Sequence, residues 1–296
     1  MFSSGGVYMK YCLSLSGGGP RGAAHVGILK ALEENHIKPY SLSGTSAGSL
    51  VCGMIAAGLS TEEMIKEVCF LAENGLKVID PDIISFIVSL PKITFKKRFS
   101  TTGLISGKRM EKYFRILFGD ILIRDLNIPI MIPAVDILSG KTIVFTNSIK
   151  NKPTIKNVVW YDNARLYEAI RASCSLPGIF SPKNIADMTL VDGGLTYNLP
   201  YELNIATKEE KILAVDLGEK YEPPFRPDIT DVLYSSFKIM QISIKNKSTN
   251  NNVLILHPPL SENAGLFCFS CMKESMERGY DYTIKNMEKI KRFLET

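Results

Sequence analysis

The sequence predicts an α/β fold built around a parallel sheet. Two short apolar segments, Tyr11 to Leu15 and Tyr40 to Ser43, are each followed by a glycine-containing turn and then by a helical pattern of apolar residues. A strand–helix–strand–helix order of this kind favours parallel strands joined by right-handed crossovers. The chain of 296 residues has no internal repeat and no linker long enough to divide it, so we expect a single domain over residues 1–296.

Helices are expected where apolar residues recur every three or four positions. In the first helix Ala24, Ile28 and Leu32 share one face, and Pro20 stands in the turn before it, where proline is tolerated. After the second predicted helix, a capping pattern at residues 60–63 predicts the start of a third. Besides the helix that starts at 60–63, the predicted helices cover residues 24–35, 46–57, 108–118, 164–180 with a break at Pro177, 228–244 and 273–294.

Strands are expected where short aliphatic runs end in turn-forming residues. Ser139 and Gly140 separate two such runs and predict a hairpin. The segment 75–106, in contrast, shows no regular pattern. The predicted strands cover residues 11–15, 40–43, both arms of the hairpin within 128–147, 188–192, 211–218 and 253–256.

The composition indicates a globular protein, since 45% of the residues are hydrophobic and 22% are charged. The net charge of +5 is not concentrated into a stripe, so we expect no nucleic-acid partner. No apolar stretch approaches the ~18 residues that cross a bilayer, and the first residues do not resemble a signal peptide. We therefore expect a cytoplasmic protein that meets a membrane, if at all, at its surface. The sequence indicates no oligomeric state.

The six cysteines do not show the pattern of a disulfide framework. Cys268 and Cys271 form a C-x-x-C pair, but no second pair and no suitably spaced histidine accompanies them, so we expect no zinc site. In apolar or alanine-rich segments a free thiol behaves as a small hydrophobic side chain, and four cysteines lie in such segments: Cys12, Cys52, Cys69 and Cys174. Reduced thiols are the expectation throughout.

The loop GGGPRG, Gly17 to Gly22, fits the spacing G-x-G-x-x-G and has two possible interpretations. A dinucleotide site needs an acidic residue at the end of the second strand, about 20 residues on, to bind a ribose hydroxyl. That strand ends in SLSGTSAG, which holds no carboxylate, and the sequence has no G-K-[ST] of a P-loop. An oxyanion hole needs only backbone N–H groups near a nucleophile. The pattern therefore favours the oxyanion interpretation.

The segment GTSAG, Gly44 to Gly48, fits G-x-S-x-G between a predicted strand and a predicted helix. In such an elbow the glycines allow a sharp turn that exposes the serine hydroxyl at the edge of the sheet. Ser46 is therefore a candidate nucleophile. The competing interpretation is that Ser46 is only a helix N-cap, a common role for serine.

A serine nucleophile needs a base, and the residues alone leave two candidates open. Asp192 ends a predicted strand and is followed by Gly193 and Gly194. A carboxylate that is partly removed from water can have a pKa suited to base catalysis. His257 also ends a strand, and the order Ser46, Asp192, His257 suits an ordinary hydrolase triad. His25 and His36 belong to the first predicted helix.

Four blocks resemble those of the patatin-like phospholipase family: GGGPRG (17–22), GTSAG (44–48), RASCSLPGIF (171–180) and VDGGLTYNLP (191–200). The resemblance covers residues 11–218, whereas the C-terminal part, 219–296, is expected as a helical extension. It implies a three-layer α/β/α fold with a mostly parallel central sheet. It also implies hydrolysis of lipid acyl esters, of phospholipids or lysophospholipids, without metal or cofactor.

Residue by residue, the resemblance implies that Ser46 is the nucleophile and Asp192 its base. The oxyanion hole would be formed by the glycine loop, with Arg21 steadying it: Gly17, Gly18, Gly19, Arg21 and Gly22. Glycines that support the two motifs would be Gly44, Gly48, Gly193 and Gly194. All of these positions agree with the family pattern.

Two alternatives remain beside hydrolysis. One is an acyltransferase of the same fold, which normally uses a histidine near the serine; the other is a non-catalytic protein that binds an anion or nucleotide at the glycine loop. Head group, acyl length and positional preference are not indicated. The apolar and basic segment 82–99 is interpreted as either a lid that touches anionic lipid or a partly buried helix with a solvated loop.

Overall fold

A computed structural model describes residues 10–79, 103–150, 152–209, 211–218, 229–245, 250–260, 265 and 267–295. Within these ranges one sheet has the strand order β5-β4-β3-β2-β1-β8-β9, and β7 pairs with β3 and β6. The strands are β1 (Cys12–Leu15), β2 (Ser41–Gly44), β3 (Ile130–Asp136), β4 (Lys141–Thr146), β5 (Val158–Tyr161), β6 (Lys183–Ile185), β7 (Met188–Asp192), β8 (Ile212–Val215) and β9 (Val253–Leu256).

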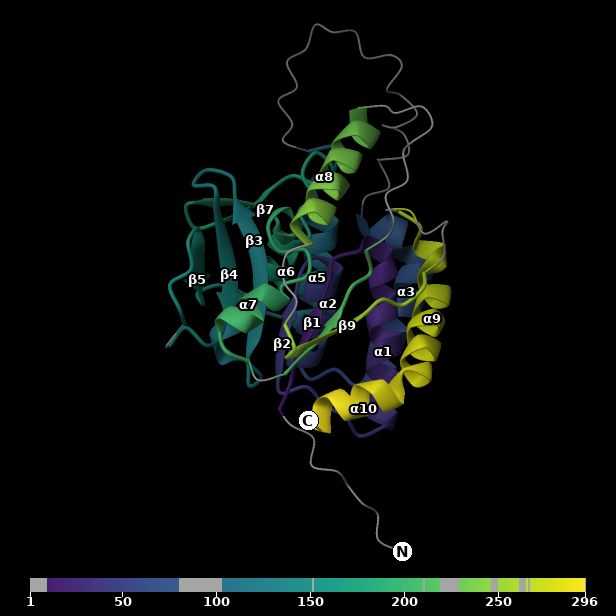
Figure 1. Cartoon of the computed structure of the whole chain (residues 1–296). Coiled ribbons are helices and arrows are strands. Elements are labelled where there is room, and N and C mark those ends of the chain that lie inside the picture. The colour runs from purple at the N-terminus through teal and green to yellow at the C-terminus, as the bar shows by residue number, and fades with distance from the viewer. Residues whose placement is uncertain are drawn as a thin grey trace, which may run out of the picture.

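Helices cover both faces of this sheet (Figure 1). The α-helices are α1 (Ala23–Glu34), α2 (Ala47–Ala56), α3 (Thr61–Ile79), α5 (Lys108–Phe118), α6 (Leu166–Ser173), α7 (Tyr201–Ala206), α8 (Ile229–Lys245), α9 (Met272–Lys285) and α10 (Met287–Glu295). The short 3-10 helices are η1 (Gly19–Gly22), η3 (Ile123–Asp125), η4 (Gly193–Leu195) and η5 (Phe269–Cys271).

Strand direction confirms the predicted mostly parallel sheet. β1 pairs in parallel with both β2 and β8, β2 with β3, and β8 with β9. The exceptions lie on one side, where β3 pairs antiparallel with β4 in the predicted hairpin and with β7. The carboxyl ends of β1 and β2 therefore meet at one edge, where α/β folds place their sites.

The two faces of the sheet differ in how they are covered. Leu13 and Leu15 of β1 point into the large core beneath α1, α2 and α6. Alternate residues of the strands point to the other face, where Cys12 packs in a smaller core with Tyr201 of α7. The predicted three-layer arrangement is thus confirmed, with one layer much thicker than the other.

The C-terminal part packs closely against the rest of the structure. β9 extends the sheet beside β8 and confirms the strand predicted at 253–256, so this part is not purely a helical extension. α9 crosses α1 at two glycines: a Cβ on Gly27 would lie 1.9 Å from the Met276 carbonyl oxygen, and one on Gly279 would lie 2.3 Å from that of Ala24. Only glycine allows the two backbones to approach this far.

Several boundaries differ from the prediction for local reasons. The helix expected at 273–294 is two helices, because the chain turns at Asn286, whose side chain donates to the Tyr282 carbonyl oxygen. α3 runs to Ile79, into the segment that shows no regular pattern, after the predicted capping contacts between Ser60 and Glu63. The short elements β5, β6 and α7 were not predicted. The segment 82–99 lies outside the described residues.

The prediction that all cysteines are reduced is wrong at one pair. Cys268 and Cys271 form a disulfide, with their Cα atoms 5.6 Å apart, within the range that a disulfide requires. The turn η5 brings the two residues together just before α9 begins. The remaining four are free thiols, buried at Cys12 and Cys52 and half-buried at Cys69 and Cys174.

Candidate active site

The glycine loop and the serine elbow lie side by side because β1 and β2 are parallel neighbours, with Leu15 opposite Gly44. The approach is too close for side chains. A Cβ on Gly48 would lie 2.3 Å from the Leu15 carbonyl oxygen, and a Cβ on Gly44 would lie 2.4 Å from the Gly48 carbonyl oxygen. Glycine at 44 and 48 thus permits the turn that carries Ser46.

Ser46 occupies a strained backbone conformation between β2 and α2. Its φ and ψ angles are 51° and −121°, a region that residues other than glycine rarely adopt and that occurs at functional sites. The side chain makes no capping hydrogen bond to α2, which argues against the N-cap interpretation. The backbone N–H of Ser46 donates to the Ser173 hydroxyl at 3.0 Å and so fixes the elbow to the end of α6.

Asp192 reaches the same edge from a strand that runs in the opposite direction. β7 pairs antiparallel with the far end of β3, so that Asp192 lies opposite Ala134. The turn after it is tight, since a Cβ on Gly193 would lie 2.2 Å from the Pro133 carbonyl oxygen. The N–H of Gly194 donates to Asp192 Oδ1 at 2.7 Å and orients the carboxyl group.

Burial changes the acidity of this carboxyl group. Asp192 is only 4% exposed, and desolvation raises its pKa to about 7. Hydrogen bonds from the Gly194 N–H and the Ser46 side chain oppose the shift without cancelling it. Asp192 therefore lies in the same cavity as the serine and has a pKa near neutrality, as suits a general base.

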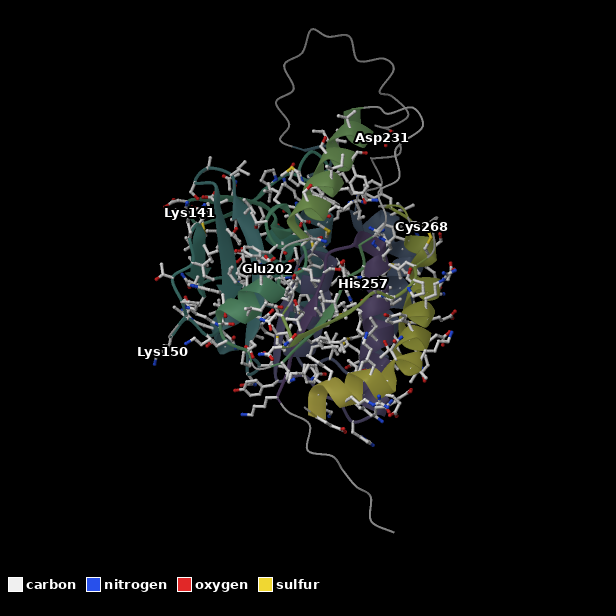
Figure 2. The ribbon with its side chains drawn as sticks, viewed as in Figure 1. Lys141, Lys150, Glu202, Asp231, His257 and Cys268 are labelled. Atoms are coloured by element: carbon white, nitrogen blue, oxygen red, sulfur yellow. A yellow bond between two sulfur atoms is a disulfide. The ribbon has the colours of Figure 1, made fainter. Side chains whose placement is uncertain are left out.

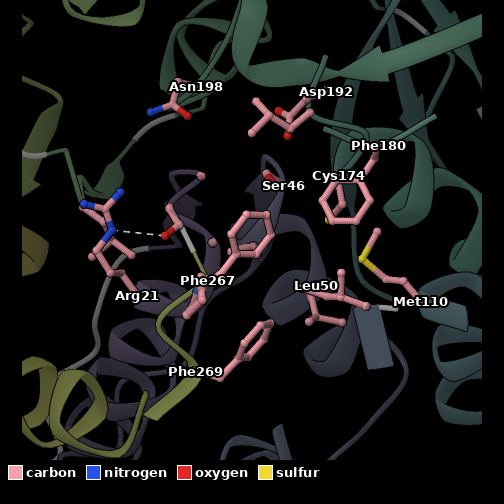
Figure 3. A pocket seen from close by; sticks show the side chains of 18 of the residues that line it. Arg21, Ser46, Leu50, Met110, Cys174, Phe180, Asp192, Asn198, Phe267 and Phe269 are labelled. Atoms are coloured by element: carbon pink, nitrogen blue, oxygen red, sulfur yellow. Dashed lines mark hydrogen bonds between the residues drawn. The ribbon is translucent and has the colours of Figure 1, made fainter. Parts of the chain in front are cut away.

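The glycine loop forms η1 and is fixed at several points. The N–H of Gly17 donates to the Asn198 carbonyl oxygen at 3.0 Å, so this amide is engaged within the protein. Arg21 Nε donates to the Gly18 carbonyl oxygen at 3.1 Å (Figure 3). A Cβ on Gly22 would lie 2.5 Å from that of Ala47, which explains glycine there by packing. Gly18 and Gly19 remain the candidate oxyanion donors.

A cavity of about 1310 Å³, including its open mouth, joins these groups. Ser46, Asp192 and the glycine loop lie on one side of it, and apolar side chains such as Leu50, Met110 and Phe180 form the walls (Figure 3). Polar side chains gather near the loop, where Gln241 of α8 donates to Asn198 Oδ1 at 3.1 Å. The cavity therefore suits a molecule with a long apolar part and a polar end.

Residues 13–205, well over half of the chain, match the family described as "Patatin-like phospholipase". The chain belongs to this family. It spans about half the length of the first curated relatives that it matches: an uncharacterized NTE family protein of Mycobacterium tuberculosis is 28% identical over 224 residues, 75% of this chain and 53% of that protein. Neuropathy target esterase sws of Drosophila melanogaster is 30% identical over 212 residues, 70% of this chain and 13% of that protein.

Human GIVD cytosolic phospholipase A2, solved in complex with methyl gamma-linolenyl fluorophosphonate, shares the fold. Its TM-score is 0.50 at 14% identity, and the match covers 96% of this chain and 58% of that chain. At this identity the likeness concerns the fold alone. It agrees with the central sheet flanked by helices seen in this patatin-like chain.

None of the three histidines is among the described residues that line the cavity of this patatin-like chain. The His257 side chain is 63% exposed at the end of β9, with Nδ1 3.7 Å from Asp216 Oδ2 (Figure 2). His25 is fully buried, its Nε2 lies 2.9 Å from the Ser16 carbonyl oxygen, and burial lowers its pKa to about 4. His36 follows the end of α1. This placement favours Asp192 over a histidine as the base.

No group of three or more potential metal-binding side chains comes together in the part of the chain that the structure describes. In the same residues, no helix is long and apolar enough to cross a membrane.

Sequence reasoning missed the part of the patatin-like site that lies outside the motifs. Phe237 and Gln241 of α8 and Phe267, Phe269 and Met272 near the start of α9 line the cavity. These positions follow the last motif block, which ends at residue 200, by more than 35 residues, and the aromatic residues among them were the only sequence signal. Cys174 also lines the cavity, and burial raises the pKa of its thiol to about 12, which disfavours the reactive thiolate.

Proposed function

We propose that this chain hydrolyses acyl esters of lipids through an acyl-enzyme, with Ser46 as the nucleophile and Asp192 as the base. One observation carries the proposal: a buried carboxyl group with a pKa near 7 shares a cavity with a serine on a strained elbow. Family membership supports it, as does the name esterase carried by a relative. The domain boundaries of 1–296, with a motif core at 11–218, belong to the same proposal.

In the first half of the reaction Asp192 accepts the hydroxyl proton of Ser46 as the serine oxygen attacks the ester carbonyl carbon. The carbonyl oxygen becomes negatively charged in the tetrahedral intermediate, where N–H groups of Gly18 and Gly19 stabilise it. The C–O bond to the leaving alcohol then breaks, and Asp192 returns the proton to that alcohol. The acyl group remains on Ser46.

In the second half water replaces the alcohol. Asp192 takes a proton from water as its oxygen attacks the acyl carbon, and then returns the proton to Ser46 as the fatty acid leaves. Both steps use the same base and the same amides, so the scheme requires no metal ion or cofactor. Arg21 holds the loop through the Gly18 carbonyl oxygen and has no proton-transfer role.

The cavity supports a lipid substrate over a small ester. Its walls are largely apolar, as an acyl chain requires, while Asn198 and Gln241 provide polar groups near the glycine loop for the end that carries the ester and head group. A phospholipid or lysophospholipid fits this division. Transfer of the acyl group to an acceptor other than water is the second candidate, which the absence of a cavity-lining histidine within the described residues disfavours.

We also propose that the chain contacts the lipid surface peripherally, through α8. The inner side of this helix lines the cavity with Phe237 and Gln241. Its outer side exposes large apolar residues and serines, with no charged side chain among those that the structure describes there: Val232, Leu233, Ser236, Ile239, Met240 and Ser243. An uncharged apolar stripe beside a lipid-binding cavity fits shallow insertion into an aggregated substrate. The segment 82–99, predicted for the same role, remains a prediction.

The proposal is tested by Ser46→Ala and a fluorophosphonate probe. The wild type is expected to be labelled at Ser46 and to hydrolyse soluble nitrophenyl esters and lipid, whereas Ser46→Ala should lose both labelling and at least about a thousandfold of activity. The folded state should be kept, which circular dichroism checks. Wild-type binding of lipid without any labelling or hydrolysis would instead support a non-catalytic binding protein. Adding an alcohol or glycerolipid acceptor and identifying the products separates hydrolysis from transfer.

A further inference from the structure

We propose that the Cys268–Cys271 disulfide is a thiol–disulfide exchange site for a dithiol reductant, and that its oxidation state sets how tightly the cavity holds a long acyl chain. The first half depends only on the two cysteines. The second half rests on the proposed function, because it concerns the acyl part of the substrate.

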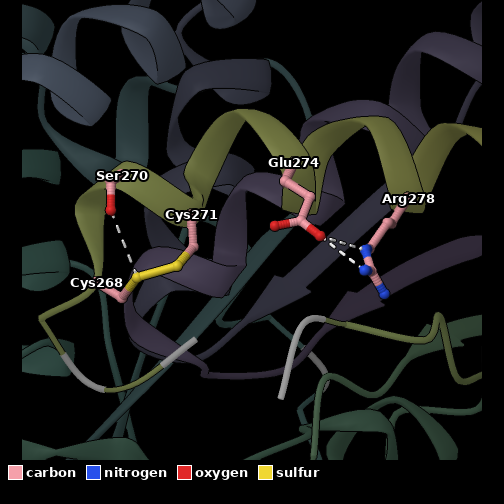
Figure 4. The surroundings of a disulfide bond; sticks show 5 residues. All are labelled: Cys268, Ser270, Cys271, Glu274 and Arg278. Atoms are coloured by element: carbon pink, nitrogen blue, oxygen red, sulfur yellow. Dashed lines mark hydrogen bonds and ion pairs between the residues drawn. A yellow bond between two sulfur atoms is a disulfide. The ribbon is translucent and has the colours of Figure 1, made fainter. Parts of the chain in front are cut away.

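The disulfide is poorly placed to act only as a stabilising cross-link. It closes a ring of four residues, and the loop entropy that a disulfide removes from the unfolded chain is smallest for such short rings. Both cysteines are half-buried, so a small reductant can reach them. Cys271 is the N-cap of the 14-residue helix α9, whose partial positive charge favours the thiolate formed on reduction (Figure 4).

The ring is joined directly to the wall of the cavity. Phe267 precedes it, Phe269 lies within it and Met272 follows it, and all three line the cavity. The Phe269 ring packs directly on Gly75 of α3, where a Cβ would lie 2.0 Å from the ring. The short helix η5 that contains Phe269 contacts both α3 and the glycine-loop helix η1.

The start of α9 is tied to α3, so the disulfide links Cys268 to an anchored part of the chain. On the α9 side Lys273 Nζ lies 3.0 Å from Glu73 of α3, and Glu274 pairs with Arg278 at 2.7 Å (Figure 4). Within the ring the contact between Cys268 Sγ and Ser270 Oγ is long, at 3.7 Å. Besides the packing of Phe269 on α3, the disulfide is the cross-link that closes the chain around Phe269.

The exchange step is balanced by the reductant. One thiolate of the dithiol attacks a sulfur of the disulfide, the S–S bond breaks, and the other cysteine leaves as a thiolate. The second thiolate of the reductant then attacks the mixed disulfide and releases the first cysteine. Two electrons pass to Cys268 and Cys271, two protons from water complete their thiols, and the reductant leaves as its own disulfide.

Reduction is expected to weaken acyl-chain binding and to leave the chemical step intact. Without the disulfide, Cys268 is no longer cross-linked to Cys271 at the start of α9, and Phe267 and Phe269 on either side of Cys268 lose that restraint on their position in the wall. A long acyl chain depends on that wall, whereas an acetyl group needs only the region around Ser46. The effect should therefore appear in KM for long esters and not in kcat for short ones.

The test compares wild-type protein with and without dithiothreitol on nitrophenyl acetate and nitrophenyl dodecanoate, both below their aggregation limits. Reduction should raise KM for the dodecanoate on the order of fivefold and change the acetate parameters less than about twofold. Mass spectrometry after alkylation of unfolded samples should find two more alkylated cysteines, at 268 and 271, in the reduced sample. These wild-type measurements need no variant.

Two variants serve as matched controls. Cys268→Ser combined with Cys271→Ser should show the KM of the reduced wild type and no response to dithiothreitol. Cys69→Ser, which removes a half-buried thiol of α3 outside the ring, should keep the full response. A response that survives in the double serine variant would overturn the proposal.

A second readout separates this proposal from the proposed function. Binding of a fluorescent long-chain fatty acid to Ser46→Ala should weaken on reduction by a similar factor, without any need for catalysis. If the wild type hydrolysed no ester but this binding still responded, the proposed function would fail and the exchange site would stand. Equal KM and equal fatty-acid affinity in both states, or an unchanged alkylation count, would refute the exchange site.

Discussion

At the scale of single residues, the proposed chemistry depends on one carboxyl group in one environment. An ordinary aspartic acid titrates near pH 4 and is a weak base at neutrality, with a pKa of about 3.9. Burial at the end of β7 raises the pKa of Asp192 to about 7, even though the Gly194 N–H and the Ser46 side chain favour its ionised form. The raised pKa should therefore affect the pH dependence of both activity and stability.

The pH dependence of kcat/KM on a soluble ester should follow Asp192. Only the carboxylate accepts the serine proton, so kcat/KM should rise with pH, level off above about 7, and fall about tenfold for each pH unit below it. His257→Ala is the matched control, since that side chain is exposed and lies next to Asp216. A profile that stays flat down to pH 5, or one that disappears in His257→Ala, would reject Asp192 as the base.

The stability of Asp192→Asn should differ from wild type in a pH-dependent way. The pKa of Asp192 is raised in the folded state, so its contribution to stability is present below pH 4 and is lost as the pH rises toward about 7. Asparagine has no such loss. Its melting temperature should match wild type near pH 4, exceed it by several degrees at pH 8, and show most of the change between these values. Equal melting curves at pH 8 would mean that folding does not raise the pKa of Asp192.

Motif residues could be placed from the sequence because their chemistry and spacing are local. Ser46 and the glycines around it occupy a turn that only small residues allow, and G-x-S-x-G expresses that turn directly. Gly17 shows the limit of such reasoning. Its amide is engaged by the Asn198 carbonyl oxygen, a partner about 180 residues away along the chain. Which amides of the loop remain for a substrate depends on that tertiary contact and not on the loop sequence.

At the scale of elements, α8 links the cavity to the surface. Periodicity predicted the helix itself within a residue at each end, but not that both of its sides carry apolar residues for different partners. Phe237 faces the cavity, while Val232 and Met240, each 48% exposed, face outward. A helix with two apolar sides gives a weak amphipathic signal, so its role could not be deduced from the pattern.

Replacing the outer stripe of α8 should weaken contact with lipid and spare the active site. The variant carries Val232→Ser, Leu233→Ser, Ile239→Ser and Met240→Ser. Vesicle binding should fall at least about tenfold, because the apolar area available for insertion is lost. Turnover of a monomeric nitrophenyl ester should change little, since the residues that line the cavity are kept. Co-sedimentation with phosphatidylcholine vesicles measures the binding.

A matched control replaces exposed apolar residues with serine at positions outside α8. Tyr40 and Ile284 are 48% and 41% exposed; the first precedes β2 at the opposite edge of the sheet, and the second lies in the last turn of α9. Tyr40→Ser with Ile284→Ser should leave vesicle binding unaltered. If this control weakened binding as much as the α8 variant, the effect would reflect general surface polarity and not a docking face.

Other elements could not be predicted because they depend on distant partners. β6 and β5 are three and four residues long and gain their strand conformation from pairing with β7 and β4. The break at Asn286 interrupts a helical pattern that continues on both sides of it. The reversed direction of β7 matters most for function, since it brings Asp192 to the edge that holds Ser46.

At the scale of the whole molecule, the folded structure includes residues that follow the region matched by the family. The family match ends at residue 205, yet β9 pairs with β8, α9 packs on α1, and Ile290 and Leu294 of α10 are fully buried. The motifs predicted the parallel sheet and the reaction centre, and local patterns predicted the helices and one strand of the extension. Its contribution to the cavity wall rests on packing that leaves no short sequence signal.

This packing predicts that the extension and the motif core unfold as one unit. Gly279→Ala adds a methyl group 2.3 Å from the Ala24 carbonyl oxygen, so α9 must move away from α1, at a cost of about 1–3 kcal/mol. Trp160, the single tryptophan, lies in β5 at the opposite end of the sheet order from β9. Its fluorescence therefore reports unfolding far from the substitution.

We expect one cooperative thermal transition in Gly279→Ala, lowered by several degrees and equal by tryptophan fluorescence and by circular dichroism. Gly265→Ala is the matched control, because a Cβ at that position would meet none of the described residues within 4 Å, and its melting temperature should equal that of wild type. An early loss of helical signal in Gly279→Ala with an unmoved Trp160 transition would contradict the single unit. It would mean that residues 219–296 unfold separately from the core that holds Ser46 and Asp192.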